Sequence, residues 1–412
     1  MNGTWRCWRE SAPPLLGEAY RNLGRRRAHR ALCVALVSMP LWLLARVDCD
    51  AESRPTSETR PLETDLDVQP PGEPSRHVTL TQALRILRVP SVSVATISDY
   101  QIDWSAAYGD ASTRTGYQAG SMSKTVAAVA ALRLVEQGRL ALDRDVNAQL
   151  TSWHIPRTSL TRRHPVTLRR LLSMTAGINV PGFVGYRPDA MLPSLVQILD
   201  GSPPANSPPV RVIRTPGTGY AYSGGGYEVI QALMQDTAHQ HFAELVKELV
   251  LQPVGMNDSF FGQRPRAPGE KMSTGHLASG AELPGGWRAM PEMAAGGLWS
   301  TPTDLARLLI GISKSFKGMD DPLLSQAMAR EMLKQNGGPY GLGLAVSGSG
   351  RSLVLMKRGQ NVGYQGYMLI FPATGQGIVV MANSDNGTTL ATSIIRRAAS
   401  VLHWPHLGKL RD

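Results

Sequence analysis

A serine and a lysine lie three residues apart in the run Gly-Ser-Met-Ser-Lys-Thr at residues 120–125. Residues three apart on a helix lie one turn apart on the same face, so the Ser121 hydroxyl and the Lys124 amine can meet. A serine hydroxyl is a poor nucleophile until a neighbouring group takes its proton. A lysine can take that proton, or can supply the positive field that helps another base. The pair predicts a nucleophilic serine, although this spacing also arises by chance.

A tyrosine lies in a second run, the glycine-rich residues 216–227. The glycines permit backbone conformations closed to other residues and let a substrate approach closely. A free tyrosine, with a pKa of about 10, is a poor base at neutral pH. Two nearby ammonium groups would favour its phenolate and make Tyr222 a candidate base. The alternative is that Tyr222 anchors a loop and that the glycines only form turns.

The third run, residues 357–364, closes one predicted strand and opens the next. An edge strand beside a nucleophile can offer a backbone N–H group to an oxyanion. Lys357 could hold a substrate carboxylate there, and Gly359 would let a substrate lie against the strand. The alternative is a basic turn that faces solvent.

Sequence periodicity predicts the elements that position the first run. Residues 91–97 alternate small polar and apolar side chains, as a strand does, and residues 102–108 are a second strand candidate. Residues 126–136 predict a helix directly after the serine, and Gly138 predicts its end. The nucleophile would then lie between a strand and a helix N-terminus.

The middle of the chain, from about residue 143 to 345, is predicted to be mostly helical with long Gly/Pro-rich connections. Thr167 is a plausible N-cap for a short helix at 168–172, and residues 227–250 have helical periodicity. Residues 301–304, Thr-Pro-Thr-Asp, have the composition of a helix start.

The C-terminal part returns to strands and then ends in a helix. We expect strands at 352–356, 364–371 and 378–382, a hairpin around 372–375, and a final helix at about 390–402. Strands therefore lie at both ends of the folded body and helices lie between them. This order predicts an α/β (α+β) fold: one antiparallel sheet built from both chain ends, flanked by helices, with an inserted all-helical lobe.

An export or anchoring segment is predicted at the N-terminus. Arg25, Arg26, Arg27 and Arg30 precede an apolar run at residues 31–45, which is short for a membrane-spanning helix. A cleaved signal peptide and an uncleaved membrane tether both fit this pattern. We therefore expect an exported protein, periplasmic or extracellular, with a membrane-anchored form as the alternative.

Composition divides the chain into four parts. Residues 1–50 are the signal peptide or anchor. Residues 51–77, rich in Pro, Glu, Ser, Thr and Arg, are predicted to be a disordered linker. Residues 78–402 form the folded domain, and residues 403–412 a tail.

Several chemistries are not predicted. The three cysteines, Cys7, Cys33 and Cys49, all precede the folded body, so it holds no disulfide, thiolate metal site or cysteine nucleophile. His239 and His241 lie on a predicted helix but, two residues apart, do not share a face. We expect neither a metal nor a cofactor. The net charge of +11 comes without a basic stripe interleaved with aromatic residues, so nucleic-acid binding is not expected.

Together, the three runs resemble the serine β-lactamase and penicillin-recognising family. That family includes class C β-lactamases, D-alanyl-D-alanine carboxypeptidases and related esterases. The resemblance consists of Ser-x-x-Lys, a later Tyr-Ser-x and a still later Lys-x-Gly in this order, and it covers roughly residues 78–402. Further family-like runs lie at 171–177, 291–306, 341–343 and 383–387.

The resemblance implies a covalent acyl-enzyme. Ser121 would be the nucleophile, and Lys124 and Tyr222 would share the general-base work and then protonate the leaving group. The backbone N–H groups of Ser121 and Gln360 would form an oxyanion hole, and Lys357 would supply positive charge to Tyr222 and the substrate. Expected substrates are small molecules or peptides, some of them derived from the cell wall: esters, D-amino-acid peptides or β-lactam-like amides.

The chain departs from the family pattern at three places. It has Tyr-Ser-Gly at 222–224 where class C enzymes have Tyr-x-Asn, Arg358 in place of the threonine of Lys-Thr-Gly, and Met174 where relatives often have histidine. Arg358 favours an acidic or carboxylate-bearing substrate, unless it points to solvent. The departures weigh against β-lactam hydrolysis. They leave one alternative function: a weakly active or inactive relative that binds peptidoglycan fragments or a protein partner.

Overall fold

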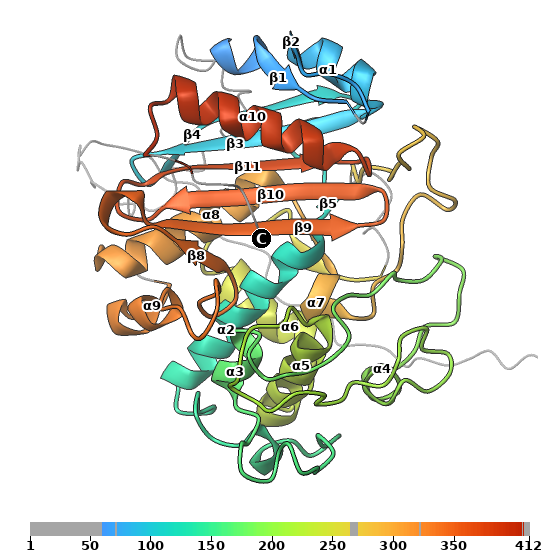
Figure 1. The fold of residues 1–412 in the computed structure, drawn as a ribbon, viewed down its shortest axis with the longest axis vertical. Helices are drawn as coiled ribbons and strands as arrows, with labels where there is room; N and C mark the ends of the chain where they lie inside the picture. The colour runs from blue at the N-terminus through green and yellow to red at the C-terminus, as the bar shows by residue number, and fades with distance from the viewer. Residues whose placement is uncertain (1–59, 71, 264–270, 321–322, 406, 408–412) are drawn as a thin grey trace, which may run out of the picture. The chain divides into compact units, whose positions relative to one another are not determined.

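A six-stranded antiparallel sheet is the centre of the fold, with strand order β4-β3-β11-β10-β9-β8 (Figure 1). The computed structural model describes residues 60–70, 72–263, 271–320, 323–405 and 407. The strands are β3 Ser91–Ser98, β4 Gln101–Gly109, β8 Ala345–Ser347, β9 Val354–Asn361, β10 Tyr364–Phe371 and β11 Gln376–Ala382. The C-terminal β11 pairs with the N-terminal β3. The prediction of one antiparallel sheet built from both ends of the domain is therefore confirmed.

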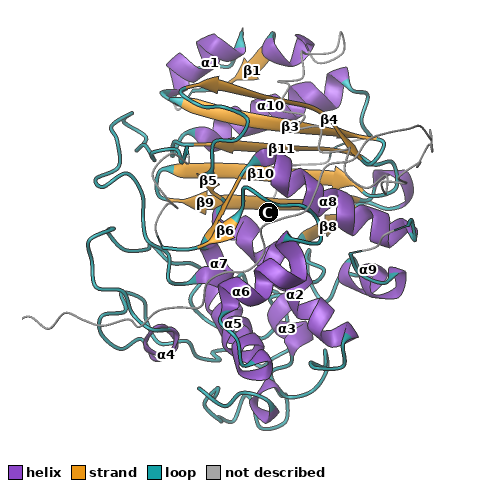
Figure 2. Cartoon of the chain, turned by 180° about the vertical axis from the view of Figure 1, so that it is seen from behind, coloured by secondary structure: helices purple, strands orange, loops and turns teal. Residues whose placement is uncertain are grey.

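Helices cover both faces of this sheet. Helix α8, Pro302–Lys317, packs on one face, and α10, Gly387–Val401, packs on the other (Figures 1 and 2). Helix α1, Leu80–Leu87, lies against α10. All eight residues of β10 are buried, as expected for a strand covered on both faces. Thr301 caps α8 by accepting a hydrogen bond from the N–H of Asp304, which confirms the predicted helix start.

Strand β9 is longer than predicted. It continues through Asn361, and the turn to β10 is confined to residues 362 and 363. The reason is that Gly359 and Gln360 stay in register with Gly366 and Gln365 of β10, so the ladder does not end at Lys357. Because β8 pairs only with residues 354–356, the other edge of β9 is left open from Lys357 onward.

The helical lobe surrounds α2, Ser123–Glu136. This helix is apolar on nearly every side and almost wholly buried, as a central helix should be. The other elements of this part of the chain are η3 Val146–Ala148, α3 Leu168–Leu172, α4 Leu195–Asp200, α5 Gly224–Ala238, α6 Phe242–Val246, the π-helical η4 Lys247–Leu251, α7 Met293–Gly296 and α9 Gln326–Met332.

The expected helix over 227–250 is interrupted. Helix α5 ends at Ala238, and α6 begins at Phe242. His239 has a left-handed backbone (φ 53°) and caps α5, whereas His241 is the N-cap of α6. The two histidines therefore lie at helix ends, contrary to the prediction that they share a helix.

Two small sheets were not predicted. Strands β5 Tyr117–Gln118, β7 Leu298–Ser300 and β6 Phe260–Phe261 form a three-stranded sheet in the order β5-β7-β6. Strands of two or three residues are too short to show the alternation on which a strand prediction depends. This sheet joins the segment just before Ser121 to the segment that follows α7. The N–H of Ala119 donates to the Leu298 carbonyl at 2.8 Å.

The second small sheet corrects the predicted linker. Residues 60–78 contain the 3-10 turn η1 Arg60–Glu63 and the paired strands β1 Leu66–Val68 and β2 Arg76–Val78. Disorder is the wrong prediction here because three apolar side chains enter the core: Leu62, Leu66 and Val68. Part of the expected tail is also packed, since the Trp404 ring meets the Phe371 ring at 6.0 Å.

The remaining boundary predictions fall outside the described residues. These are the signal or anchor at 1–50, residues 51–59 of the linker and most of the tail. Among the helices that the structure describes, none combines the length and the apolar character needed to cross a bilayer.

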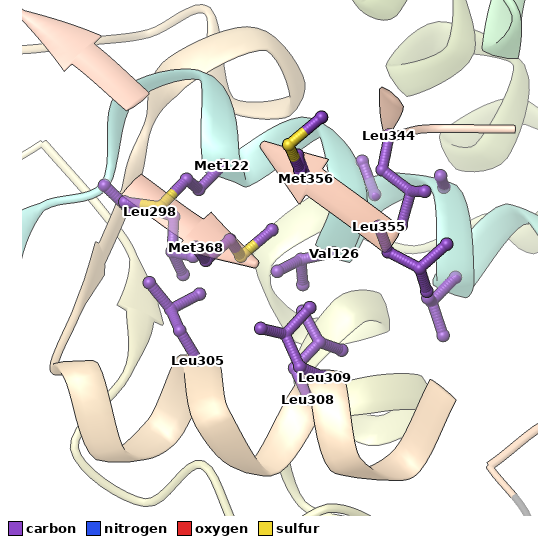
Figure 3. Packing of buried hydrophobic residues seen from close by; sticks show 14 of the residues in the cluster. Met122, Val126, Leu298, Leu305, Leu308, Leu309, Leu344, Leu355, Met356 and Met368 are labelled. Atoms are coloured by element: carbon purple, nitrogen blue, oxygen red, sulfur yellow. The ribbon is translucent and has the colours of Figure 1, made fainter. Parts of the chain in front are cut away.

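The core joins the nucleophile region to the sheet. Figure 3 shows Leu305 and Leu309 of α8 pointing toward Val126 of α2 and Met368 of β10. Met122, directly after Ser121, is fully buried, and a Cβ placed on Gly366 would lie 2.5 Å from its Cε. The side chain next to the nucleophile thus anchors the turn to the sheet.

Leu66 provides a test of the corrected N-terminal boundary. Leu66→Ala removes a fully buried side chain, so we expect it to lower the free energy of unfolding by about 2–5 kcal/mol. The control is Gln69→Ala, which changes an exposed residue of the same segment and should cost less than about 0.5 kcal/mol. Urea unfolding measures both. Equal midpoints for Leu66→Ala and wild type would show that the segment is a linker after all.

Candidate active site

The nucleophile candidate lies in a single tight turn, η2 Gly120–Met122, at the start of α2. The second serine of the run supports the backbone, since Ser123 Oγ donates to the Gly120 carbonyl at 2.6 Å and accepts the N–H of Leu298 at 3.1 Å. Ser123 is fully buried, whereas Ser121 lines a cleft. The geometry therefore distinguishes the two hydroxyls and leaves Ser121 as the accessible one.

Lys124 lies under Ser121, as the helical spacing predicts. Its Nζ is 3.0 Å from Ser121 Oγ and donates to the Ala295 carbonyl at 2.6 Å. The side chain is 1% exposed. Burial lowers the pKa of Lys124, Tyr222 opposes this shift, and the nearby Lys357 adds to it. A neutral amine in contact with a serine hydroxyl can accept its proton.

Tyr222 lies between the two lysines. Its ring centroid is 5.3 Å from Lys124 Nζ and 5.1 Å from Lys357 Nζ. The loop that carries it is fixed by the next residue, since Ser223 Oγ accepts the N–H of Gly226 at 3.0 Å and caps α5. Of the two alternatives, the structure thus has Tyr222 at the cleft, facing two amines.

A second tyrosine, which was not predicted from the sequence, holds Lys357. Lys357 is fully buried, and its Nζ donates to the Tyr340 hydroxyl at 2.8 Å. Tyr340 stacks on Tyr220 at 5.4 Å and meets the edge of Tyr222 at 6.3 Å. The one signal was position, because Tyr340 directly precedes the family-like run at 341–343.

Two glycines bring the open edge of β9 against the nucleophile turn. A Cβ on Gly359 would lie 2.0 Å from the Ala119 carbonyl oxygen. A Cβ on Gly120, whose φ is +51°, would lie 2.5 Å from the backbone nitrogen of Gln360. Such distances are possible only without side chains. The approach places the Gln360 backbone nitrogen next to the turn that carries Ser121, where an oxyanion donor is needed.

The side chains surround a cleft of about 790 Å³. The polar residues that line it include Ser121, Tyr222, Arg358, Gln360 and Asp385, and Phe183 forms part of an apolar wall. Arg358 is half-buried and belongs to this lining, so it is not simply a solvent-facing residue. The structure thus brings the predicted polar residues together at one site, and Gly359 supports it through the backbone.

Two buried carboxyl groups behind Lys124 were also missed. Glu228 of α5 and Glu292, the residue before α7, are both fully buried. Burial is the main cause that raises the pKa of Glu228, and it raises the pKa of Glu292 from 4.5 to about 7. In the sequence, each is a lone acid in a mostly apolar stretch, and this was the only pattern that could have indicated a buried carboxyl group. Within the described part of the chain, no three His, Cys, Asp or Glu side chains gather as a metal site requires.

Comparisons with known proteins identify a family for the chain. A family model described as Beta-lactamase matches residues 79–403. The chain is 24% identical over 237 residues to Protein flp of Staphylococcus aureus strain MRSA252, covering 52% of this chain and 42% of that protein. The chain thus spans less than half the length of this relative.

Solved structures share the fold. The D-amino acid amidase from Ochrobactrum anthropi SV3, complexed with L-phenylalanine, matches with a TM-score of 0.66 at 19% identity, covering 84% of this chain and 100% of that one. The octameric penicillin-binding protein homologue from Pyrococcus abyssi matches with a TM-score of 0.64 at 21% identity, covering 79% and 76%.

Gly359 tests the close approach of β9. In Gly359→Ala the new methyl group would meet a backbone oxygen that cannot rotate away, so we expect a loss of about 1–3 kcal/mol in the free energy of unfolding. The control is Gly219→Ala, where a Cβ meets nothing within 4 Å. Denaturant midpoints of the two variants should therefore differ clearly. Equal midpoints would mean that β9 does not press against the nucleophile turn.

Glu292 gives a pH-dependent prediction. Its folded-state pKa is raised, so the folded protein holds this proton more tightly than the unfolded chain, and stability is lost as the pH rises from about 4.5 through 7. A shift of that size corresponds to about 3 kcal/mol. Glu292→Gln should therefore gain stability over wild type as the pH is raised from 4.5 to 8. Thermal unfolding across this range measures the gain, and a difference that stays constant with pH would show that burial does not raise this pKa.

Proposed function

The chain belongs to the Beta-lactamase family, and on that premise we propose that it is a serine hydrolase working through a covalent acyl group on Ser121. The observation that carries the proposal is the contact between Lys124 Nζ and Ser121 Oγ at 3.0 Å, beside a tyrosine that faces two amines. Substrates would be esters, D-amino-acid peptides or β-lactam-like amides.

Acylation would begin with a proton transfer. Lys124, whose pKa is lowered by burial, takes the Ser121 proton with the help of Tyr222, and Ser121 Oγ attacks the substrate carbonyl carbon. The carbonyl π electrons move to the oxygen, which the backbone N–H groups of Ser121 and Gln360 stabilise. When the tetrahedral intermediate collapses, Lys124 and Tyr222 return the proton to the leaving group.

Deacylation would repeat these steps with water. The same basic groups take a proton from water, which attacks the acyl carbon, and Ser121 leaves as its hydroxyl is reprotonated. Lys357 stays close to Tyr222 throughout and favours its phenolate form when it acts as a base. The buried contact of Lys357 with Tyr340 keeps this charge in place.

The residues that line the cleft support a substrate that is acylated or peptide-like and that carries a negatively charged group. Arg358 lies where it could pair with a substrate carboxylate, in a cleft large enough for a small peptide. The neighbouring D-amino acid amidase structure adds D-amino-acid amides to the substrates to be tried. A cell-wall fragment would combine both features.

The location of the protein is proposed from the sequence. The arginines at 25–30 followed by the apolar run at 31–45 support export, with the leader either cleaved or kept as a membrane tether. An exported enzyme of this kind would meet cell-wall peptides in the periplasm or outside the cell.

A binding function without turnover is the second candidate. The observation that favours it is Gly224, which provides no side-chain amide at the place where class C enzymes have asparagine. Such a protein would bind cell-wall fragments or a partner and leave them intact. Substrate turnover that depends on Ser121 would exclude it.

Covalent labelling tests the proposed function. A fluorophosphonate should add one adduct to the wild-type chain and none to Ser121→Ala, and hydrolysis of p-nitrophenyl esters or D-alanyl peptides should fall roughly 10³-fold or more in that variant. Intact mass and absorbance measure the two effects. The control is Ser123→Ala, whose folded fraction should still be labelled. Labelling of Ser121→Ala equal to wild type, or no labelling of wild type, would contradict the proposal.

A further inference from the structure

A buried glutamate is connected to the proposed base through one residue. Glu228 Oε1 accepts the N–H of Ala295 at 3.0 Å, and the Ala295 carbonyl accepts Lys124 Nζ at 2.6 Å. Lys124 in turn contacts Ser121 Oγ. Glu228 is fully buried on α5 and does not line the cleft. It can therefore influence the site through Ala295 and through its charge, without contacting a substrate.

Helix α5 supplies the missing cap of α7. The first N–H groups of a helix have no partner within it, and Glu292, the N-cap of α7, makes no capping hydrogen bond with its side chain. Instead, Gln231 Oε1 accepts the N–H of Ala294 at 2.9 Å, and Glu228 accepts that of Ala295. These two bonds fix the short helix whose carbonyl holds Lys124.

The carboxyl group at 228 is more than this capping requires. Gln231 makes an equivalent bond with a neutral amide, so a glutamine at 228 would satisfy the same N–H group. The second oxygen, Glu228 Oε2, is buried without a hydrogen-bond partner among the described residues. Burying a charged group in this way is costly unless an opposite charge lies nearby. Lys124 meets this condition once it carries the proton taken from Ser121.

The charged and titratable groups around Glu228 form a small set. Glu292, the residue before α7, repels its charge, and Lys124 of α2 attracts it. Beyond Lys124 lie Tyr222 and Lys357, and Tyr186 faces Glu292. Two carboxyl groups so close together share protons, so the pair carries fewer than two negative charges near neutral pH. Burial and Glu292 raise the pKa of Glu228 and Lys124 lowers it, so negative charge is drawn onto Glu228 when Lys124 becomes an ammonium group.

We infer that Glu228 is a positioning residue for the hydrolytic reaction: it fixes the Ala295 carbonyl that holds Lys124, and its carboxylate stabilises the ammonium group that forms when Lys124 takes the Ser121 proton. This inference rests on the proposed function. The proton moves from Ser121 Oγ to Lys124 Nζ, the Oγ lone pair forms the bond to the acyl carbon, and the proton later leaves with the leaving group. Glu292 opposes this effect, because a negative charge on Glu292 disfavours a negative charge on Glu228.

The test is the pH dependence of Ser121 labelling by fluorophosphonate, together with kcat/KM for an ester substrate. Both rise with pH as Lys124 loses its proton. Glu228→Gln keeps the volume and the acceptor for Ala295 but removes the charge, so the pKa of Lys124 falls. The acid limb, the part of the pH profile in which the rate rises, should then move down by about 0.5–1 pH unit. Glu292→Gln relieves the repulsion on Glu228 and should move the limb up.

Two further variants separate charge from support. Gln231→Leu removes a capping bond of α7 without changing charge, so it should lower the plateau rate and leave the limb in place. Glu228→Asp keeps the charge but draws it back from Ala295, so its limb should stay near that of wild type while its plateau falls.

The outcomes are distinct. Opposite shifts for Glu228→Gln and Glu292→Gln support the inference. An unmoved limb in Glu228→Gln, with a plateau loss like that of Gln231→Leu, would reduce Glu228 to a structural cap and overturn it. If wild type shows no labelling or turnover that depends on Ser121, the proposed function itself fails, which is a different result.

Discussion

The structure depends on holding one buried amine in place. Lys124 Nζ lies between the Ala295 carbonyl at 2.6 Å and Ser121 Oγ at 3.0 Å, with almost no exposure to water. A buried ammonium group needs acceptors, and a buried neutral amine is a better base than an exposed one at neutral pH. The central helix, the short α7 and the sheet edge all contribute to this arrangement. The fold can thus be understood as the scaffold that keeps Lys124 dry and fixed.

Close backbone packing is the second constraint, and it links the lobe to the sheet. Gly120 and Gly359 let the nucleophile turn and β9 approach to distances that no side chain would allow. Ser123 and Met122 then tie the same turn to β7 and to the core. The residues on either side of Ser121 therefore serve its position, which is why a short run of sequence carries so much information.

Local patterns predicted what local physics determines. The Ser121–Lys124 contact follows from helical spacing, and five strands of the main sheet follow from sequence pattern and turn residues, whereas the three-residue β8 was not predicted. Tyr340, Glu228 and Glu292 could not be found this way, since their partners lie far away in the chain. The segment around Leu66 was missed for the same reason. Its few apolar residues gain a core through α10 and α1, and Ser393 Oγ of α10 donates to the Asp67 carbonyl at 2.6 Å.

The most direct test of the proposed acyl-enzyme mechanism is a crystal structure of the protein after reaction with a phosphonate ester. The mechanism predicts phosphorus bonded to Ser121 Oγ, with the phosphonyl oxygen within hydrogen-bonding distance of the backbone nitrogens of Ser121 and Gln360, and Lys124 still bound to the Ala295 carbonyl. An adduct on another residue, or a phosphonyl oxygen turned toward solvent with Lys124 displaced, would contradict it.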